Sequence, residues 1–370
     1  MMDEKLKNPF TPVVGKVPVF MAGRDNIIAD MEELFDEGPS SPSVISLLVG
    51  ARGTGKTALL SYFAREAESK GWVTAQVSCA KGMLEEISLH AIRSAEHLID
   101  STPKKKLKSV SIAKIGSLEW DNAHEEPQSW RTKMENILDA LADTDTGLLI
   151  TVDEVNSSIP EMTTLVSAFQ HFIDEDRKVA LLMAGLPYGL SALLSGKTTS
   201  FLRRAARYNL GPISDYDVRE ALVVTMEKGG KTFESEALDK AVEAINGFPY
   251  MLQLVGYRAW RISTDRTTIN VRDIENAISI AQTELEERVY EATWFELTPA
   301  DKAFLYALLE DDSVTLQSTL ASRLGKTSAH VSRYKKRLLQ EGVIQEKSKG
   351  VIEFCLPGFR SYVAQMKADE

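Results

Sequence analysis

The sequence predicts an α/β fold: a parallel sheet flanked by helices, followed by an all-helical lid and a C-terminal winged-helix domain. Three observations predict it. Short, almost continuously apolar segments alternate with amphipathic helical segments in the first half of the chain, which is typical of strands buried on both faces. A glycine-rich loop joins the first of these strands to a helix. After Gly211-Pro212, helical patterns follow without further strands.

The elements of the first half follow from the spacing of their apolar residues. Residues 1–43 form an N-terminal segment whose prolines, Pro9, Pro12 and Pro18, favour an extended chain before a helix that ends near Phe35. Residues 44–212 are expected to form one α/β unit. Its predicted strands cover 44–49, 72–78, 147–152, 179–184 and 207–210, and its predicted helices cover 56–69, 83–99, 128–142 and 160–174.

One segment of this unit interrupts the alternation. Residues 104–120 lie between two predicted helices and have the pattern of a hairpin, with a basic start at Lys104-Lys105-Lys106 and Gly116 near its end. A solvated surface hairpin is one interpretation. A contact arm for a partner, a neighbouring subunit or nucleic acid is the other, and both stay open at this point.

The glycine-rich loop has the spacing Gly-x-x-x-x-Gly-Lys-Thr, between an apolar strand and a helix, the context in which this motif binds a polyphosphate. Its glycines allow backbone angles that a Cβ would forbid, and the helix that follows points its positive dipole end at the same anion. Lys56 is expected to neutralise the β- and γ-phosphates, and Thr57 to hold Mg²⁺. The predicted phosphate-binding residues are Gly50, Ala51, Arg52, Gly53, Thr54, Gly55, Lys56, Thr57 and Ala58.

A pair of carboxylates completes the predicted catalytic site. The apolar strand Leu148–Val152 ends in Asp153-Glu154, at the carboxyl edge where ligands bind in α/β sheets. Asp153 is expected to hold the Mg²⁺ hydration shell, and Glu154 to orient and polarise the attacking water as a general base. The pair therefore predicts that the chain hydrolyses a nucleotide and does not only bind it.

Arginines before the last strand are candidates for a further catalytic role. Phosphoryl transfer benefits from an arginine that reaches the γ-phosphate, often from a neighbouring subunit. Arg204 and Arg207 are the candidates for this role. Several arginines on one helix are also typical of a solvated face, so both interpretations remain.

The composition is that of an ordinary globular protein, with 44% hydrophobic and 26% charged residues. The two cysteines, Cys79 and Cys355, lie far apart, which argues against a disulfide scaffold and a cysteine-based zinc site. The charged N-terminus lacks the apolar core of a signal peptide, and no apolar run reaches the length of a membrane span. We expect a soluble cytoplasmic protein without a membrane partner.

The net charge of −10 is unevenly distributed. Residues 322–350 contain eight basic and two acidic residues, so this segment carries +6 and the rest of the chain −16. The phosphate backbone of a nucleic acid would contact this basic segment, even though the chain as a whole is acidic.

Two further units follow the α/β unit. The lid is predicted over residues 213–292, with helices at 214–228, 235–246, 248–262 and 271–290. The C-terminal unit is predicted over 297–370, and it starts with Thr298 as N-cap and Pro299 at the first helical position. Its predicted elements are helices at 300–310, 316–324 and 328–340 and strands at 342–346 and 351–355, the order of a winged helix.

The third helix of this unit has the pattern of a recognition helix. Val331, Tyr334 and Leu338 share one face and are expected to pack inward. A winged helix that contacts protein, with a merely solvated basic face, is the alternative. The predicted DNA contacts are Arg333, Lys336, Arg337 and Gln340 on the opposite face, with Lys347 and Lys349 in the wing.

With these motifs placed, the chain resembles AAA+ P-loop ATPases of the origin-recognition/initiator-like and STAND branch over nearly its whole length. The segment Phe20–Asp25 resembles the "GRE" box of that group, which sits by the adenine, and Gly247-Phe248-Pro249 resembles the Gly-x-Pro motif of STAND lids. The resemblance implies ATP and Mg²⁺ as cofactors and places Gly23, Arg24 and Pro249 in the nucleotide site.

The resemblance also bears on catalysis. The family places an arginine several residues before a strand that ends in Leu-x-Pro, and Leu210-Gly211-Pro212 in that register favours Arg204. The family often has a polar sensor residue after the fourth strand, where this chain has Ala184-Gly185-Leu186-Pro187. Either Asn156 partly takes over this role or γ-phosphate sensing is weak, which predicts slow turnover.

These inferences predict a Mg²⁺-dependent ATPase that acts as a slow switch, with double-stranded DNA as partner and a homo-oligomer or a protein partner as further possibilities. The alternative is a STAND-type signalling or defence ATPase whose winged helix binds a protein. A third interpretation is a nucleotide-binding scaffold with negligible turnover.

Overall fold

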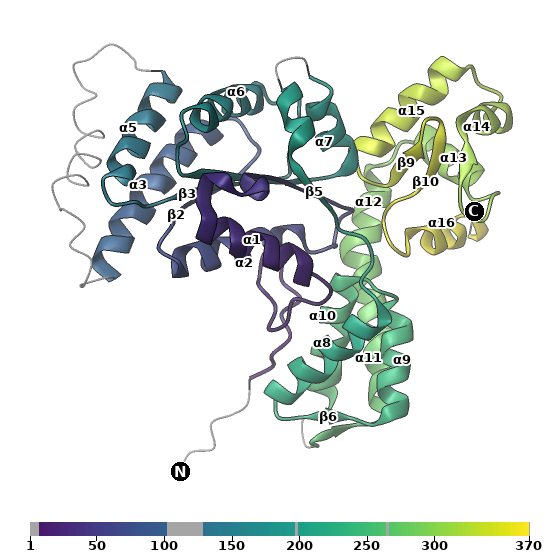
Figure 1. The fold of residues 1–370 in the computed structure, drawn as a ribbon. Coiled ribbons are helices and arrows are strands. Elements are labelled where there is room, and N and C mark those ends of the chain that lie inside the picture. The colour runs from purple at the N-terminus through teal and green to yellow at the C-terminus, as the bar shows by residue number, and fades with distance from the viewer. Residues whose placement is uncertain (1–6, 102–128, 197–198, 264–265, 370) are drawn as a thin grey trace.

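The computed structural model describes residues 7–101, 129–196, 199–263 and 266–369. The predicted hairpin at 104–120 therefore lies outside the described residues. Figure 1 shows three units: an α/β core, a helical lid below it and a C-terminal unit beside both. Within the described ranges, no helix has the length and apolar composition needed to cross a bilayer.

Five parallel strands form the core sheet, in the order β2-β3-β4-β1-β5. Each predicted strand is present within one residue of its expected ends, and the α/β fold is confirmed. β1 lies between β4 and the edge strand β5, so the loop that follows β1 leaves the carboxyl edge of the sheet between these two strands. The strands are β1 (Ile45–Val49), β2 (Val73–Ser78), β3 (Leu148–Asp153), β4 (Val179–Gly185) and β5 (Ala206–Asn209).

Helices cover both faces of this sheet, and each face has its own apolar core. Leu47 and Leu48 are neighbours in β1, both fully buried, and belong to opposite cores. Burying each contributes about 1.5–3 kcal/mol, which explains why the strands are apolar without alternation. One face carries α1 (Asp25–Glu37) and α2 (Lys56–Ser69); the other carries α3 (Met83–Ser101), α5 (Trp130–Ala142), α6 (Pro160–Asp174) and α7 (Pro187–Leu194).

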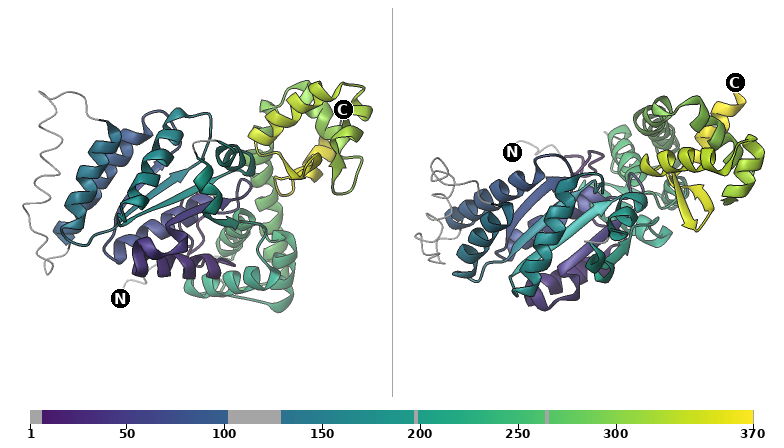
Figure 2. Two further views of the ribbon diagram at one scale, coloured as in Figure 1. Left: turned by 45° about the horizontal axis from the view of Figure 1, so that its top comes forward. Right: turned by 90° about the horizontal axis from the view of Figure 1, so that it is seen from above.

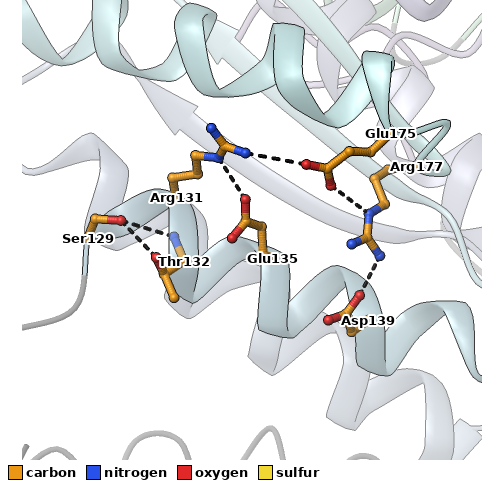
Figure 3. A network of polar contacts seen from close by, with 7 residues as sticks. All are labelled: Ser129, Arg131, Thr132, Glu135, Asp139, Glu175 and Arg177. Atoms are coloured by element: carbon orange, nitrogen blue, oxygen red, sulfur yellow. Dashed lines mark hydrogen bonds and ion pairs between the residues drawn. The ribbon is translucent and has the colours of Figure 1, made fainter.

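An ion-pair network fixes α5 against the loop between α6 and β4 (Figure 3). Arg131 binds Glu135 within α5 and Glu175 beyond α6, with contacts of 2.6 and 3.3 Å. Arg177 binds the same Glu175 at 3.2 Å and also pairs with Asp139 of α5. All of these groups are partly exposed, so each pair contributes at most about 1 kcal/mol. The network orients α5 rather than supplying the stability of the core.

The lid is a helical unit whose core includes a residue from the N-terminus. Phe10 is 2% exposed and packs among the lid helices. The N-terminal segment therefore contacts the lid, although the residues of the core lie between them in the sequence. The short strands β6 (Thr232–Phe233) and β7 (Thr268–Ile269) pair within the lid, a pairing that the sequence did not predict. The lid helices are α8 (Asp215–Lys228), α9 (Ser235–Ile245), α10 (Pro249–Ile262) and α11 (Val271–Leu285).

The first helix of the C-terminal unit begins at Pro299 with Thr298 as its N-cap, as predicted. Thr298 accepts a hydrogen bond from the Asp301 N–H, and the Asp301 carboxylate accepts one from the Thr298 N–H, which forms a capping box. A continuous helix links this unit to the lid: α11 passes through a π-helical turn (Glu286–Tyr290) into α12 (Glu291–Glu296).

Three helices and an antiparallel sheet of order β8-β10-β9 form the C-terminal unit, and a last helix, not predicted, follows them. Both views of Figure 2 place this unit at the end of the molecule that is far from α3 and α5. Its elements are α13 (Pro299–Leu308), β8 (Thr315–Leu316), α14 (Gln317–Leu324), α15 (Ser328–Gln340), β9 (Ile344–Ser348), β10 (Val351–Phe354) and α16 (Phe359–Ala368).

Candidate nucleotide site

The glycine-rich loop joins β1, which lies between β4 and the edge strand β5, to the first turn of α2. Gly53 (φ 78°) and Gly55 (φ 91°) adopt left-handed conformations that favour glycine. Gly50 is required for a different reason, because a Cβ there would lie 2.6 Å from Thr54 Oγ1 and 2.9 Å from the carbonyl oxygen of Leu210. A side chain would therefore strain the backbone at Gly53 and Gly55 and would clash with neighbouring atoms at Gly50.

Lys56 lies inside this loop. Its Nζ donates hydrogen bonds to the carbonyl oxygens of Gly50 at 2.9 Å and Ala51 at 2.6 Å. Burial lowers the pKa of Lys56 to about 8, although the nearby Asp153 carboxylate opposes the shift. A bound phosphate would favour the charged form. The loop thus places the Lys56 amine where it can bind a polyphosphate.

The residues predicted to bind Mg²⁺ come together although they are distant in sequence. Thr57 Oγ1 donates a hydrogen bond of 2.5 Å to Asp153 Oδ2, across 96 residues. Asp153 ends β3 and Thr57 lies in the first turn of α2, so the parallel sheet brings them to one edge. A hydroxyl and a carboxylate are the oxygen ligands that suit Mg²⁺.

Glu154 follows directly and has an unusual backbone. Its φ is 54°, in the left-handed region that residues with a Cβ rarely adopt, and its N–H donates to Asp153 Oδ1 at 2.8 Å. Such strain costs of order 1–3 kcal/mol and is found at functional sites. The turn exposes the Glu154 side chain beside the Thr57–Asp153 pair, as a residue that positions a water requires.

A pocket of about 210 Å³ extends from the loop between the N-terminal segment and the lid. Arg24 and Pro249, both predicted from the family motifs, line it. Arg24 is 9% exposed, and its guanidinium donates to the carbonyl oxygens of Thr54 at 3.4 Å and Gly211 at 3.2 Å. Burial lowers the pKa of Arg24, with Asp217 opposing. Arg24 therefore links the phosphate loop to the start of the lid.

The Gly-x-Pro segment of the lid packs directly on the loop. A Cβ on Gly53 would lie 2.6 Å from the ring of Phe248. Gly247 has a φ of 68°, and its carbonyl oxygen accepts a hydrogen bond of 2.9 Å from the Ile213 N–H. Pro249 is the first residue of α10. Any displacement of α10 relative to the core must therefore change the packing on Gly53.

The carboxyl end of β4 carries no polar side chain, as the sequence indicated. The Gly185 carbonyl oxygen accepts a hydrogen bond from the Gly50 N–H at 3.3 Å. Asn156, the alternative sensor, uses its side-chain oxygen to accept hydrogen bonds from the N–H and hydroxyl of Ser158. This pairing fixes the Asn156 amide within the turn after β3.

The C-terminal unit lies against the phosphate side of the site. Arg52 of the loop forms an ion pair of 3.6 Å with Glu341, which follows α15. A Cβ on the next residue, Gly342, would lie 2.9 Å from the Leu186 side chain. Burial raises the pKa of Cys355 to about 11, with the charge of Lys56 opposing. A cavity of about 690 Å³ separates the loop from the end of β10.

The two candidate arginines lie at the edge of the core. Arg204 ends a short 3₁₀ helix (Ser200–Arg204), and Arg207 belongs to β5, the edge strand. Both side chains are exposed, and neither forms an ion pair within the part of the chain that the structure describes. They are therefore accessible to another molecule.

The basic residues of the C-terminal unit divide into two groups. The four basic residues of segment 322–350 that form no ion pair among the described residues are all exposed: Lys326, Arg333, Lys336 and Lys349. Gln340, the uncharged residue predicted to contact DNA, is exposed as well. Ion pairs engage four of the eight basic residues of segment 322–350, namely Arg323, Lys335, Arg337 and Lys347.

Arg337, which was predicted to contact DNA, forms an ion pair within the C-terminal unit. Its Nε and Nη2 donate to Asp301 Oδ1 at 2.9 and 2.5 Å, and Nη2 also donates to Thr298 Oγ1. The Asp301 side chain is 1% exposed, so its carboxylate needs a cation to compensate for lost hydration. Arg337 supplies this charge and joins α15 to the N-terminus of α13.

Comparison with known families identifies the core. Residues 21–183 match the AAA ATPase domain family. This part of the chain is therefore similar to an AAA ATPase domain. Residues 287–363 match a domain of unknown function, DUF8462, and no curated protein matches the sequence.

Solved structures with the same fold support this assignment. The Walker-type ATPase paby2304 of Pyrococcus abyssi is 15% identical, with a TM-score of 0.63, over 93% of this chain and 96% of that one. Cdc6p from Pyrobaculum aerophilum is 13% identical, with a TM-score of 0.50, over 96% of both chains. At these identities the similarity shows a shared fold. The predicted AAA+ resemblance is therefore confirmed at that level.

Thr11 and Gln253 are among the residues that line the pocket without having been predicted from the sequence. Thr11 comes from the N-terminal segment and Gln253 from α10, and the Thr11 N–H donates to Gln253 Oε1 at 2.9 Å. Neither residue belongs to a motif. The prolines of this segment predicted an extended chain, but no signal in the sequence placed it against the lid.

Proposed function

We propose that this protein is an AAA+ switch that binds ATP with Mg²⁺, hydrolyses it slowly, and is coupled to double-stranded DNA through its C-terminal unit, which acts as a winged helix. One observation carries the proposal. The helix that would contact DNA, α15, leads directly into Glu341 and Gly342, which contact Arg52 of the phosphate loop and Leu186 beyond β4. A change at the phosphates therefore has a direct route to the DNA-binding helix.

The catalytic part of the proposal assigns one role to each residue. Lys56 neutralises the β- and γ-phosphates, and Thr57 and Asp153 hold Mg²⁺, which when bound stabilises the charge of the transferring phosphoryl group. Glu154 orients and polarises the attacking water. Because β4 ends without a polar side chain and the Asn156 oxygen is bound to Ser158, sensing of the γ-phosphate is weak and turnover is slow.

A second copy of the chain completes the site in this proposal. Arg204 is exposed at the edge of the core and has no ion pair among the described residues. An arginine supplied by a neighbouring molecule can stabilise the transition state by several orders of magnitude. Arg204 would serve this role in trans, with Arg207 as the alternative.

The DNA part rests on the shape and charge of the C-terminal unit. Three helices followed by a hairpin, with a three-stranded antiparallel sheet, are the elements of a winged helix. Its third helix exposes Arg333, Lys336 and Gln340, and the hairpin turn exposes Lys349. Such a helix places its outer face in the major groove, and lysines in the hairpin bind the phosphate backbone.

A STAND-type ATPase whose C-terminal unit binds a protein is the second candidate. The observation that favours it is the internal pairing of half of the basic residues in segment 322–350, which leaves a smaller positive patch than the composition indicated. Turnover that needs a protein partner, and is unchanged by DNA, would favour this candidate.

The experiment that separates the two measures binding to duplex DNA by fluorescence anisotropy at two salt concentrations. The variant Arg333→Glu with Lys336→Glu should weaken binding more than tenfold and reduce the salt slope by about 2, one for each lost phosphate or base contact. The control, Arg65→Glu with Arg272→Glu, makes the same charge change on α2 and α11. Equal effects of both variants, or no binding by the wild-type chain, would contradict coupling to DNA.

A further inference from the structure

The lid and the C-terminal unit share one hydrophobic core. Their buried apolar side chains form a single contiguous cluster that runs from Leu254 in the lid to Phe304 and Val363 in the C-terminal unit. The two faces of the core sheet have clusters of their own, and neither of these includes a described residue of the lid or of the C-terminal unit. Because one contiguous cluster is typical of one packed domain, the lid and the C-terminal unit are packed as a single body.

The helix that connects the two units carries aromatic side chains into this shared cluster (Figure 1). Tyr290, in the π-helical turn, is 5% exposed and packs against Phe359 and Tyr362 of α16, with ring centroids 5.6 and 5.5 Å away. Trp294 of α12 packs against Tyr362 and Tyr306 at 6.3 and 5.9 Å. Such aromatic pairs stabilise a structure beyond the area that they bury. The connecting helix therefore cannot bend without breaking these contacts.

A hydrogen bond closes the same junction. The Tyr290 hydroxyl donates to the carbonyl oxygen of Pro357 at 2.6 Å. The next residue, Gly358, has a φ of 74°, and a Cβ at this position would overlap the Tyr290 hydroxyl. Glycine therefore permits the close approach that this hydrogen bond requires. The bond fixes the segment before α16 to the π-helical turn at the end of α11.

The boundary between this body and the α/β core is packed differently. Tyr188 of α7 is only partly buried where it packs against the shared cluster. The ion pair between Arg52 and Glu341 is exposed, and a cavity of about 690 Å³ separates the phosphate loop from the end of β10. A boundary with exposed contacts and a cavity costs less to rearrange than a filled core. Movement is therefore expected at this boundary rather than within the shared cluster.

The chain crosses this boundary at Gly211. Leu210 before it is buried in a cluster of the α/β core, and Ile213 after it is buried in the shared cluster. A Cβ on Gly211 would meet no described atom within 4 Å beyond its chain neighbours. Hinges are a few residues at the ends of elements that absorb changes in φ and ψ. Gly211 has the conformational freedom and the space for this role.

We propose that the lid and the C-terminal unit move as one rigid body against the α/β core, about a hinge at Gly211, when a nucleotide binds. The inference rests on the proposed function for the signal that starts the movement. The body carries Phe248, which packs on Gly53 of the phosphate loop, and it also carries α15. A displacement at the phosphate loop therefore reorients the proposed DNA-binding helix without any bending between the lid and the C-terminal unit.

Native-state hydrogen exchange of the full chain, followed by mass spectrometry at low urea concentrations, tests whether the body is single. The variant Tyr290→Phe leaves the Pro357 carbonyl without its donor. Because a single body opens as a whole, this variant should raise the opening constant about tenfold in both α10 and α16 and leave β3 and β4 unchanged. Faster exchange in α16 with α10 at the wild-type level would show two separate units and overturn the proposal.

The matched control is Tyr208→Phe, which removes a tyrosine hydroxyl from the α/β core. The Tyr208 hydroxyl donates to Asp30 Oδ2 at 2.8 Å, between β5 and α1. This variant should raise the opening constant within the α/β core and leave α10 and α16 at the wild-type level. An equal increase in all three units for both variants would show that the whole chain opens together, and this would also overturn the proposal.

Distances between spin labels, measured by double electron–electron resonance, test the movement. The labels replace one exposed serine in each unit, Ser69→Cys in the core, Ser279→Cys in the lid and Ser318→Cys in the C-terminal unit, two at a time. Cys79 and Cys355 are replaced by serine. When Mg²⁺ and a non-hydrolysable ATP analogue are added, both distances to the core label should shift, and the distance between the lid and C-terminal labels should stay unchanged.

The remaining outcomes each contradict a different statement. A shift in the distance between the lid and C-terminal labels would overturn the single body. Bound nucleotide with all three distances unchanged would overturn the movement. A chain that binds no nucleotide would overturn the proposed function itself, and the hydrogen-exchange comparison, which needs no nucleotide, would still decide whether the lid and the C-terminal unit are one body.

Discussion

The two halves of the nucleotide pocket are built in different ways. The phosphate half comes from the α/β core, and its polar groups pair within the protein: Lys56 with loop carbonyls and Thr57 with Asp153. The other half, which we call the base half, comes from residues 8–18, the strap, and from the lid, and the Thr11 N–H donates to Gln253 Oε1 between them. From this difference we expect turnover to depend on the core and nucleotide affinity to depend also on the lid, so substitutions should separate the two.

The largest expected effect lies in the phosphate half. Glu154→Gln should lower the rate of ATP hydrolysis about 10²- to 10⁴-fold, because the amide cannot accept a proton from water. ATP affinity should change little, since the base half is intact. Phosphate release and equilibrium binding measure the two quantities, with Glu220→Gln on the exposed face of α8 as control. Unchanged turnover would remove Glu154 from the catalytic role.

A substitution in the base half should lower ATP affinity and leave the rate of hydrolysis at saturating ATP unchanged. Phe10→Ala leaves a cavity beneath the strap, which should lower the free energy of unfolding by about 3–5 kcal/mol, with the strap detached from α10. ATP affinity should fall, whereas the rate at saturating ATP should stay near that of the wild type. Urea unfolding and nucleotide binding measure these effects. Loss of turnover with unchanged ATP affinity would mean that the halves are not separate.

The dependence of affinity on pH should report on Lys56. Its pKa without nucleotide is about 8, and a bound polyphosphate raises this pKa because it favours the charged form. Binding therefore takes up a proton above pH 8. ATP affinity should be constant below that pH and fall above it, by at most about tenfold per pH unit.

Calorimetry at pH 8.5 in two buffers of different ionisation enthalpy measures this proton uptake directly. The hydroxyl of Thr11 and the amide of Gln253 do not titrate in this range, so Thr11→Val should leave the uptake unchanged. Proton release on binding, or an affinity independent of pH up to 9.5, would contradict the environment assigned to Lys56.

The smallest expected effect concerns the contact between the phosphate half and the C-terminal unit. Arg52 and Glu341 are 46% and 38% exposed, so their coupling free energy should be below about 1 kcal/mol. A double-mutant cycle with Arg52→Ala and Glu341→Ala, read by thermal unfolding, measures it. A larger coupling would show that this ion pair, rather than the packing of Gly342 on Leu186, holds the unit in place.

The phosphate half could be predicted from the sequence because its signals are local. The Gly-x-x-x-x-Gly-Lys-Thr loop and the apolar strand before Asp153 are each contiguous, and the parallel sheet brings them together by its topology. The helices at 56–69 and 160–174 have the ends that the apolar spacing predicted.

The base half could not be predicted in this way. Thr11 and Gln253 meet across 242 residues, and no motif marks either of them. The pairing of Arg337 with Asp301 was missed for a similar reason, because the helical period placed Arg337 outward while the charge of a buried capping residue drew it inward. Strands of two residues, such as β6 and β7, are too short to show a period.

The ATPase rate of the full chain with Mg²⁺, measured with and without duplex DNA, tests the central claim most directly. Slow hydrolysis that increases when DNA is added is the predicted result, and Arg333→Glu with Lys336→Glu should abolish the increase. A rate that DNA leaves unchanged would contradict coupling between the phosphate loop and α15. The absence of Mg²⁺-dependent hydrolysis under both conditions would contradict the catalytic assignment as well.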